Sequence, residues 1–239
     1  MRVPGINLFL TGTLLFLFTM ACTHRQDRRR IIFFGDSITQ EGVEPGGYID
    51  LLNGLLQRHG LDDSIALIGA GVPGNTINDL YARLATDVLA EAPEIVVIYV
   101  GINDVWHKRT YGAGTDAAVF EQRYQDIIDA LAEQGIRTVL CTPSVIGERG
   151  DKANPQDEDL DRYSDIVRAL ARKNGLALVD LRTAFLEHER RNNPSNKETG
   201  VLTTDGVHLN AAGNRLVAEA MWSVLQGELV RSHRPARER

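Results

Sequence analysis

Cysteine is scarce in this sequence, which has only Cys22 and Cys141 among its 239 residues. Cys22 lies near the N-terminus and far from Cys141, so the sequence offers no framework of disulfides to hold a fold together. Cys141 follows the apolar run Thr138 to Leu140 and is expected to be a small buried core residue rather than a nucleophile. The fold must therefore rest on a hydrophobic core, which a chain of this length can build.

The sequence also lacks a surplus of basic residues. It has 26 Lys and Arg against 32 Asp and Glu, for a net charge of -6. Phosphate backbones are bound by concentrated basic faces, and the body of this chain shows no such cluster. With 43% apolar and 6% aromatic residues, the composition is that of an ordinary globular protein with one main domain. We therefore exclude a nucleic-acid partner and expect a small-molecule one.

The longest apolar run, Ile6 to Ala21, is shorter than the roughly 20 residues that a membrane-spanning helix needs. Arg2 precedes this run and small residues end it, which is typical of a secretory signal peptide at residues 1–21. Ala21-Cys22 resembles the end of a bacterial lipoprotein signal, although Thr19 stands where such signals usually carry an aliphatic residue. Thr19-Met20-Ala21 also fits soluble export, and an uncleaved anchor is a third alternative. The prediction is an exported protein, either secreted or held at a membrane through an acylated Cys22, as a periplasmic or membrane-tethered lipoprotein.

Five short runs rich in Ile and Val alternate with longer segments of helical periodicity. The runs predict strands that are buried on both faces, and the segments between them predict helices with one apolar stripe. This alternation favours an α/β fold, a three-layer α/β/α sandwich with a parallel sheet of about five strands. We expect a linker at 22–30, the domain at 31–230 and a disordered tail at 231–239. The predicted strands are 31–34, 65–68, 95–100, 136–140 and 176–179, and a last helix follows Asn210 as its N-cap.

Polar motifs follow three of the predicted strands. Ser37 lies in GDSIT after the first, GAGVPGNT ends the second, and Asn103 lies in GIND after the third. Reactive groups in parallel sheets gather at the carboxyl ends of the strands, so we expect these motifs to meet. Asp205 and His208 lie in DGVHL before the last helix, and this spacing allows a carboxylate to orient an imidazole as general base. Taken singly, each motif also fits a turn or a helix cap.

In their order, the four segments GDSIT, GAGVPGNT, GIND and DGVHL resemble the four blocks of the SGNH or GDSL-like hydrolase family, which includes lysophospholipase-like esterases. The resemblance covers Gly35 to Leu209 and implies a flavodoxin-like SGNH hydrolase fold. It also implies Ser37 as nucleophile, His208 as base oriented by Asp205, and an oxyanion hole formed by Ser37, Gly74 and Asn103. One departure is Gly69, where the second block often begins with Asn, and Gly71 competes with Gly74 as donor.

Two other kinds of enzyme are disfavoured. No Gly-x-Ser-x-Gly elbow surrounds Ser37, so the α/β-hydrolase fold is not the right comparison. His59, His188 and His233 are scattered, and the sequence predicts no metal site and requires no cofactor.

The substrate is less well defined by the sequence. Trp106 and His107 follow the third block and are candidates for substrate contact together with Asp36, although Trp106 could instead pack its loop and His107 could be solvated. The connections 144–159 and 192–204 are rich in Gly, Pro and charge and offer no long apolar stripe for a fatty chain. We therefore expect a short acyl group, acetyl first, on a polar alcohol such as a carbohydrate. Lysophospholipase, thioesterase and aryl-esterase activities are alternatives, as is a non-catalytic surface binding protein, and the oligomeric state stays open.

Overall fold

A five-stranded parallel sheet forms the centre of the molecule in the computed structural model, which describes residues 28–150 and 152–231. The strand order is β2-β1-β3-β4-β5, the order of flavodoxin-like sheets. This confirms the predicted fold class. The strands are β1 (Arg29–Gly35), β2 (Ile65–Gly71), β3 (Ile95–Tyr99), β4 (Arg137–Cys141) and β5 (Ala177–Val179).

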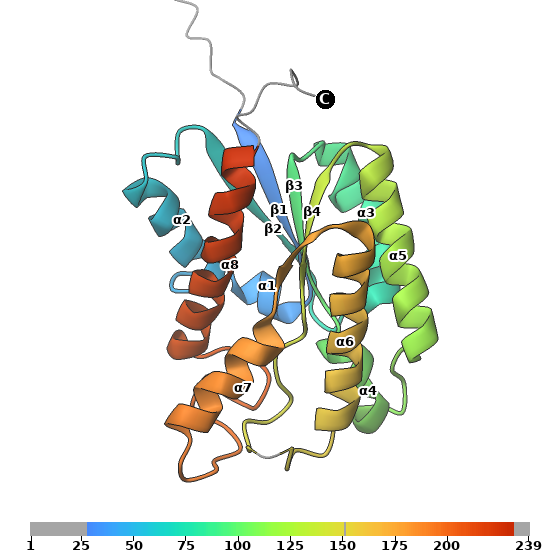
Figure 1. Ribbon diagram of the computed structural model, residues 1–239, viewed down its shortest axis with the longest axis vertical. Coiled ribbons are helices and arrows are strands. Elements are labelled where there is room, and N and C mark those ends of the chain that lie inside the picture. The colour runs from blue at the N-terminus through green and yellow to red at the C-terminus, as the bar shows by residue number, and fades with distance from the viewer. Residues whose placement is uncertain (1–27, 151, 232–239) are drawn as a thin grey trace, which may run out of the picture.

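Helices cover both faces of the sheet. α2 (Tyr48–Arg58) and α8 (Ala211–Arg231) pack together on one face, and α3 (Ile77–Asp87), α5 (Ala117–Glu133) and α6 (Asp157–Asn174) cover the other (Figure 1). Right-handed crossovers between parallel strands require this distribution. β3 is consequently buried along its whole length and β1 from Ile31 to Gly35, as their continuous apolar sequences predict. The remaining elements are α1 (Ser37–Glu41), the 3₁₀ turn η1 (Leu89–Glu91), α4 (Ile102–Thr110) and α7 (Leu181–Asn192).

Several elements differ from the sequence-based expectation. β1 begins at Arg29, inside the predicted linker, because Arg29 and Arg30 continue the pairing with β2 and form ion pairs with Glu94 and Glu91. α8 extends to Arg231, the first residue of the predicted tail. α4 occupies the segment that includes Trp106 and His107, for which no helix was predicted.

The second strand is also longer than its apolar run. β2 continues through Gly69 to Gly71 because both glycines lie against the segment that includes α1: a Cβ at Gly71 would collide with the backbone nitrogen of Gln40. Glycine in a strand often marks such a close approach. The expected loop after the second strand therefore begins at Val72.

The predicted details of the core and the last helix agree with the structure. Cys141 is fully buried at the end of β4, and burial raises the pKa of its thiol far above the usual range, so it stays protonated. Asn210 caps α8 through its Oδ1, which accepts hydrogen bonds from the backbone of Ala212 and Gly213 at 2.8 and 3.0 Å. The predicted signal peptide, Cys22 and residues 232–239 lie outside the described residues.

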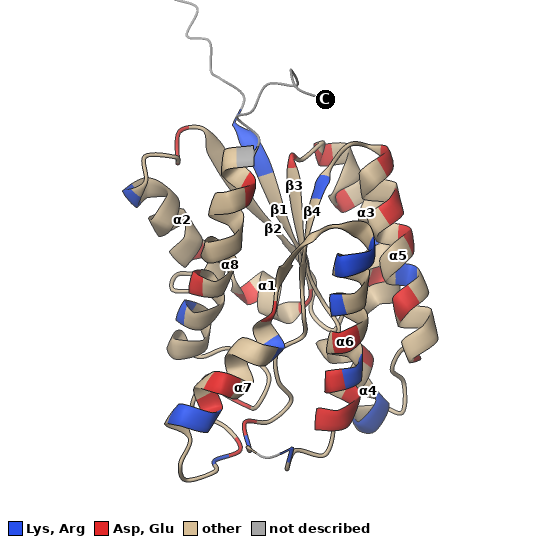
Figure 2. Cartoon of the chain, in the orientation of Figure 1, with Lys and Arg blue, Asp and Glu red and all other residues tan. Residues whose placement is uncertain are grey.

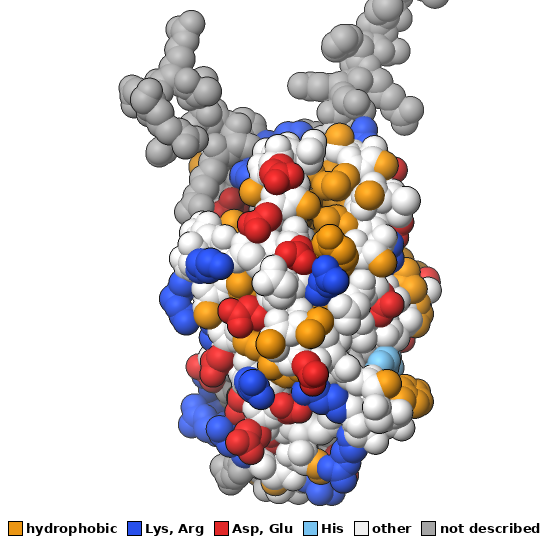
Figure 3. All heavy atoms as spheres, turned by 90° about the vertical axis from the view of Figure 1, so that its right-hand side faces the viewer, with side chains coloured by type: hydrophobic (Ala, Val, Ile, Leu, Met, Phe, Trp, Pro, Cys, Tyr) orange, Lys and Arg blue, Asp and Glu red, His pale blue; other side chains and the backbone are white. Residues whose placement is uncertain are grey.

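Charged residues of both signs are spread over the helices and loops (Figure 2). On the face seen in Figure 3, acidic and basic side chains alternate with apolar ones, without a concentrated patch of one sign. No helix within residues 28–150 and 152–231 combines the length and the apolar character needed to cross a bilayer.

Candidate active site

The structure brings the four sequence blocks together at the carboxyl edge of the sheet. Ser37 begins α1 and is separated from the end of β1 by one residue. Gly74 lies in the loop between β2 and α3, and Asn103 lies in the first turn of α4 after β3. The loop before α8 adds Asp205 and His208 from the other end of the chain. Convergence at this edge is what the strand-end rule predicts for parallel sheets.

Ser37, His208 and Asp205 form a continuous chain of hydrogen bonds. Ser37 Oγ lies 3.0 Å from His208 Nε2, and His208 Nδ1 lies 2.7 Å from Asp205 Oδ2. An ionised carboxylate only accepts, so Nδ1 donates to Asp205 and Nε2 accepts from the serine hydroxyl. This arrangement orients the imidazole to remove the proton of Ser37.

The loop itself fixes the Asp205 carboxylate. Asp205 Oδ1 accepts hydrogen bonds from the backbone nitrogens of Val207 and His208 at 2.9 and 2.8 Å. Partial burial would raise the pKa of Asp205, but the hydrogen bond from the His208 ring and these two backbone donors outweigh it and lower that pKa. Asp205 is therefore ionised at neutral pH and can stabilise an imidazolium.

Ser37 is held by a tight turn at the start of α1. Asp36 Oδ1 accepts from the backbone nitrogen of Ile38 at 3.0 Å, and Gly35 has no room for a Cβ beside Thr39 and the Tyr99 carbonyl. Asp36 is only 2% exposed and burial raises its pKa to about 7. The Asp36 carboxyl group thus caps α1 and has little exposed surface, and its predicted contact with substrate stays a prediction.

Gly74, in the loop that follows β2, and Asn103, in the first turn of α4 after β3, are candidate hydrogen-bond donors besides the Ser37 backbone. Gly74 has a φ of +75°, which only glycine adopts readily, and a Cβ there would meet nothing closer than His107 Cε1 at 4.0 Å. Asn103 is buried and its Nδ2 donates to the Asn75 carbonyl at 3.0 Å. An amide nitrogen has two N–H groups, so one remains for another acceptor. Gly71 lies within β2, which leaves Gly74 as the glycine of this loop that is suited to be a donor.

Two residues that the sequence analysis missed hold this loop. Arg83 on α3 donates to Asn75 Oδ1 at 2.7 Å and to the carbonyls of Gly35 and Ala70 at 2.8 and 3.0 Å. Asp104 is buried, and both of its oxygens accept from the backbone nitrogen of Ile77 at 3.1 and 3.2 Å; burial raises its pKa to about 6. Arg83 lies within the helix α3, and no local motif distinguishes it from a surface arginine.

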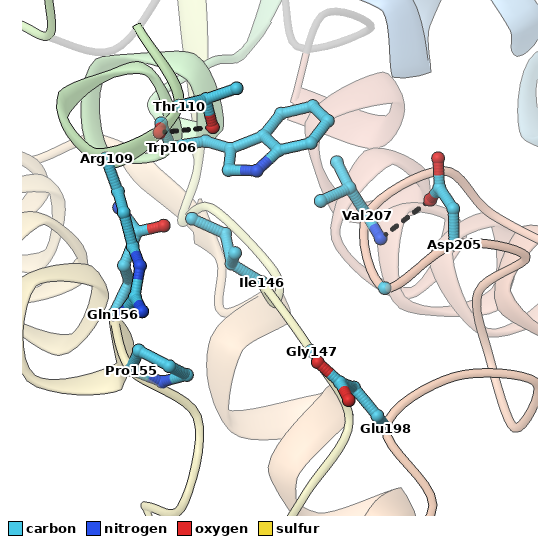
Figure 4. A pocket seen from close by; sticks show the side chains of 11 residues that line it. Trp106, Arg109, Thr110, Ile146, Gly147, Pro155, Gln156, Glu198, Asp205 and Val207 are labelled. Atoms are coloured by element: carbon cyan, nitrogen blue, oxygen red, sulfur yellow. Dashed lines mark hydrogen bonds between the residues drawn. The ribbon is translucent and has the colours of Figure 1, made fainter. Parts of the chain in front are cut away.

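A cleft of about 330 Å³ lies next to the loop of Asp205, between α4 and the connections 146–156 and 198–207 (Figure 4). The Trp106 indole reaches from α4 toward Val207 and stands edge-on to the His208 ring, with the ring centres 6.3 Å apart. His107 is half-buried, and burial lowers its pKa despite the opposing charge of Asp79. The cleft is lined by Trp106, Arg109, Thr110, Ile146, Gly147, Pro155, Gln156, Glu198, Asp205, Gly206 and Val207.

Within the part of the chain that the structure describes, no three His, Cys, Asp or Glu side chains are grouped so that they could hold a metal ion.

Residues 33–216 match the model of the GDSL-like lipase/acylhydrolase family. This match covers most of the chain and includes all four blocks. The chain belongs to this family. It is accordingly a carboxylic ester hydrolase, in agreement with the resemblance noted in the sequence.

The most similar relatives include acetylxylan esterases. The acetyl xylan esterase AlAXEase, known from a crystal structure, shares 54% sequence identity with this chain, and the two structures superpose with a TM-score of 0.80. The match covers 81% of this chain and 98% of the AlAXEase chain. The acetylxylan esterase of Geobacillus stearothermophilus is 31% identical over 85% of this chain and 96% of its own length. A Bacillus subtilis protein named uncharacterized lipoprotein YqeF is 24% identical over 87% of this chain and 93% of its own.

Proposed function

We propose that this enzyme removes acetyl groups from acetylated xylan or xylooligosaccharides, with Ser37 as nucleophile. The observation that carries the proposal is the hydrogen-bond chain from Ser37 through His208 to Asp205, which borders a polar cleft. Solved structures of catalytic mutants of a Geobacillus stearothermophilus acetylxylan esterase replace a serine, an aspartate and a histidine. The aspartate and the histidine are three residues apart in that enzyme, as Asp205 and His208 are here.

In the first step, Ser37 Oγ attacks the carbonyl carbon of the acetyl ester while its proton passes to His208 Nε2, 3.0 Å away. The carbonyl π electrons move to oxygen and give a tetrahedral oxyanion. Asp205 stabilises the imidazolium formed on His208 and keeps its ring oriented. His208 then donates its proton to the sugar oxygen, the ester bond breaks, and an acetyl-Ser37 intermediate remains.

The oxyanion needs hydrogen-bond donors during this step. The backbone N–H groups of Ser37 and Gly74 and the remaining N–H of Asn103 Nδ2 supply them. Such donors act on charge that develops only in the transition state, and removing one costs about 10²- to 10³-fold in rate in comparable sites. In the second step, water loses a proton to His208 and attacks the acetyl carbonyl, and acetate leaves as Ser37 regains its proton.

The cleft beside Asp205 supports a carbohydrate alcohol rather than a fatty chain. At about 330 Å³ it is at the small end of ligand pockets, and its walls include the polar side chains of Arg109, Gln156 and Glu198 (Figure 4). Trp106 supplies an apolar face, on which the C–H groups of a sugar ring can pack. In this proposal His107, which lies on the Gly74 side of α4, contributes to the acyl end of the site.

We also propose that the enzyme is exported and tethered through an acylated Cys22, with secretion as the alternative. Support comes from the apolar run before Cys22 and from the similarity to a Bacillus lipoprotein. Globomycin, which blocks lipoprotein signal cleavage, would cause the uncleaved precursor to accumulate. A Cys22→Ala variant that stays membrane-bound in the same amount would contradict acylation.

Hydrolysis of p-nitrophenyl esters from acetyl to decanoyl, beside acetate release from acetylated xylooligosaccharides, tests the function. The proposal expects the highest kcat/KM at acetyl and rapid acetate release from the oligosaccharide. A steady rise in kcat/KM from the acetyl to the decanoyl ester would instead indicate a lipid ester as the substrate. Absence of turnover with every ester would favour a non-catalytic binding protein instead.

A further inference from the structure

Glu148 lies outside the four sequence blocks, yet its carboxylate is fully buried beneath the loop that leads to Asp205. Its Oε1 accepts from the backbone nitrogens of Leu202 and Thr203 at 2.5 and 2.6 Å, and its Oε2 accepts from that of Val201 at 2.7 Å. Three successive N–H groups that converge on one anion form a backbone nest. The single side chain of Glu148 thus fixes the conformation of three consecutive residues.

The backbone around Glu148 binds the same loop at two further points. Gly147 N donates to the Gly206 carbonyl at 2.8 Å, and Glu148 N donates to the Glu198 carbonyl at 2.9 Å. Ile146 and Gly147 accordingly run beside the loop of Asp205 (Figure 4). The loop 198–208 is therefore held on both sides of the Glu148 carboxylate.

This clamp continues directly to the catalytic pair. The backbone nitrogen of Thr203 donates to Glu148, and Thr203 Oγ1 accepts a hydrogen bond from Gly206 N at 3.0 Å. Thr203 also pairs with Leu209 in an isolated antiparallel β-bridge. Asp205 and His208 lie inside this closed turn. The Asp205 side chain is 49% exposed, so packing does little to fix it and its position depends on the loop backbone.

We propose that Glu148 is a positioning residue, which sets the geometry of Asp205 and His208 by clamping the loop that carries them. The inference rests on the proposed roles of Asp205 and His208. A carboxylate offers acceptors only and so matches three N–H donors, whereas the amide of a glutamine would turn an NH₂ group against one of them. Glu148→Gln should therefore shift the loop with almost no change in side-chain volume.

Glu189 on α7 provides a matched control in the same region. It is 2% exposed, and neither of its oxygens has a hydrogen-bond partner among the residues that the structure describes. Burial raises its pKa to about 8, and the charges of Glu148 and Asp157 act in the same direction while Arg182 opposes them. Glu189 is thus neutral at pH 7, and Glu189→Gln leaves the charge of the region unchanged.

The test measures kcat, KM and the pH profile of kcat/KM with p-nitrophenyl acetate for wild type, Glu148→Gln, Glu148→Asp, Glu189→Gln and His208→Ala. Misplacing a catalytic group by about 1 Å can cost about 10²-fold, so we expect Glu148→Gln to lower kcat by about 10- to 100-fold with little change in KM. The acidic limb of the kcat/KM pH profile of Glu148→Gln should move to lower pH, because a displaced Asp205 no longer stabilises the imidazolium. Glu189→Gln should behave like wild type.

The outcomes distinguish a positioning role of Glu148 from a purely structural one. If Glu148→Gln loses thermal stability but keeps kcat and the pH profile, or if it matches Glu189→Gln, the inference is wrong. If Glu148→Gln does not fold, Glu148→Asp replaces it, and unchanged kcat in that variant is equally contradictory. An active His208→Ala variant would instead overturn the proposed function, so the two failures are distinguishable.

Discussion

His208 Nδ1 lies 2.7 Å from Asp205 Oδ2, although about half of the Asp205 side chain is exposed to solvent. The short contact depends on the turn that joins the two residues, in which Asp205 Oδ1 also accepts the backbone N–H of Val207 and His208. An exposed carboxylate gains little from low dielectric, so its effect on the imidazole comes mainly from orientation and hydrogen bonding.

Asp205→Asn tests this orientation. The amide can donate to Nδ1, which favours the tautomer whose proton is on Nε2, and that nitrogen can no longer accept the serine proton. We expect kcat with p-nitrophenyl acetate to fall by about 10³- to 10⁴-fold, by analogy with the same substitution in serine proteases. A loss of less than tenfold would mean that His208 does not depend on Asp205.

Asn103→Ala tests the oxyanion hole. Removing a donor that acts in the transition state should lower kcat by about 10²- to 10³-fold and leave KM within a small factor. Asn53→Ala, at an exposed position of α2, is the control and should retain full activity. A large rise in KM without a fall in kcat would show that Asn103 binds the ground state instead.

Trp106→Ala tests the sugar cleft. We expect KM for acetylated xylooligosaccharides to rise by about tenfold, which corresponds to about 1.4 kcal/mol of lost contact, whereas KM for p-nitrophenyl acetate changes less. Trp222→Ala on α8 serves as the control, because Trp222 packs against His59 rather than against the cleft. Equal changes in KM for both substrates would contradict a role for Trp106 in binding the sugar.

Glu189 makes stability depend on pH in a defined direction. Its pKa is about 8 in the folded state against 4.5 as the ordinary value, so the unfolded chain releases a proton between these values while the folded chain keeps it. The contribution of the neutral Glu189 carboxyl to the free energy of unfolding is fully present below pH 4.5. This contribution is lost as pH rises through 8, by at most roughly 1.4 kcal/mol per pH unit.

Glu189→Gln should consequently match wild type in urea unfolding near pH 4.5 and be more stable by a few kcal/mol near pH 8. Glu187→Gln, an exposed residue of the same helix, should change stability by less than about 1 kcal/mol at both pH values. A Glu189→Gln variant with the same stability difference at both pH values would show that Glu189 is not buried as a neutral acid.

Much of the site was predictable because its residues lie in short motifs at strand ends or before the last helix. The blocks of Ser37, Asn103, Asp205 and His208 carry information through their order along the chain. Short apolar runs predicted the five strands, and helical periodicity predicted the layers that cover them. Residues that act through burial were not predictable in this way. Arg83 and Glu148 are isolated charged residues without a recognisable motif around them, and each binds a backbone segment far away in the chain, at Gly35 and at 201–203 respectively.

Asp36 has a role that its motif alone did not reveal. Its place next to the nucleophile suggested contact with substrate, and the structure adds that its carboxyl group caps the helix beginning at Ser37, 3.0 Å from Ile38 N. Adjacency in sequence does not determine the direction of a side chain. The helix α4 was likewise missed because it is short and mostly polar, which leaves little apolar periodicity to detect.

Acetate release from acetylated xylooligosaccharides by wild type and Ser37→Ala, together with the Tm of both, tests the central claim most directly. The account predicts rapid release by wild type and none above background for Ser37→Ala, with Tm values within a few degrees because Ser37 contributes one part-buried hydrogen bond. Continued release by a folded Ser37→Ala variant would contradict Ser37 as the nucleophile.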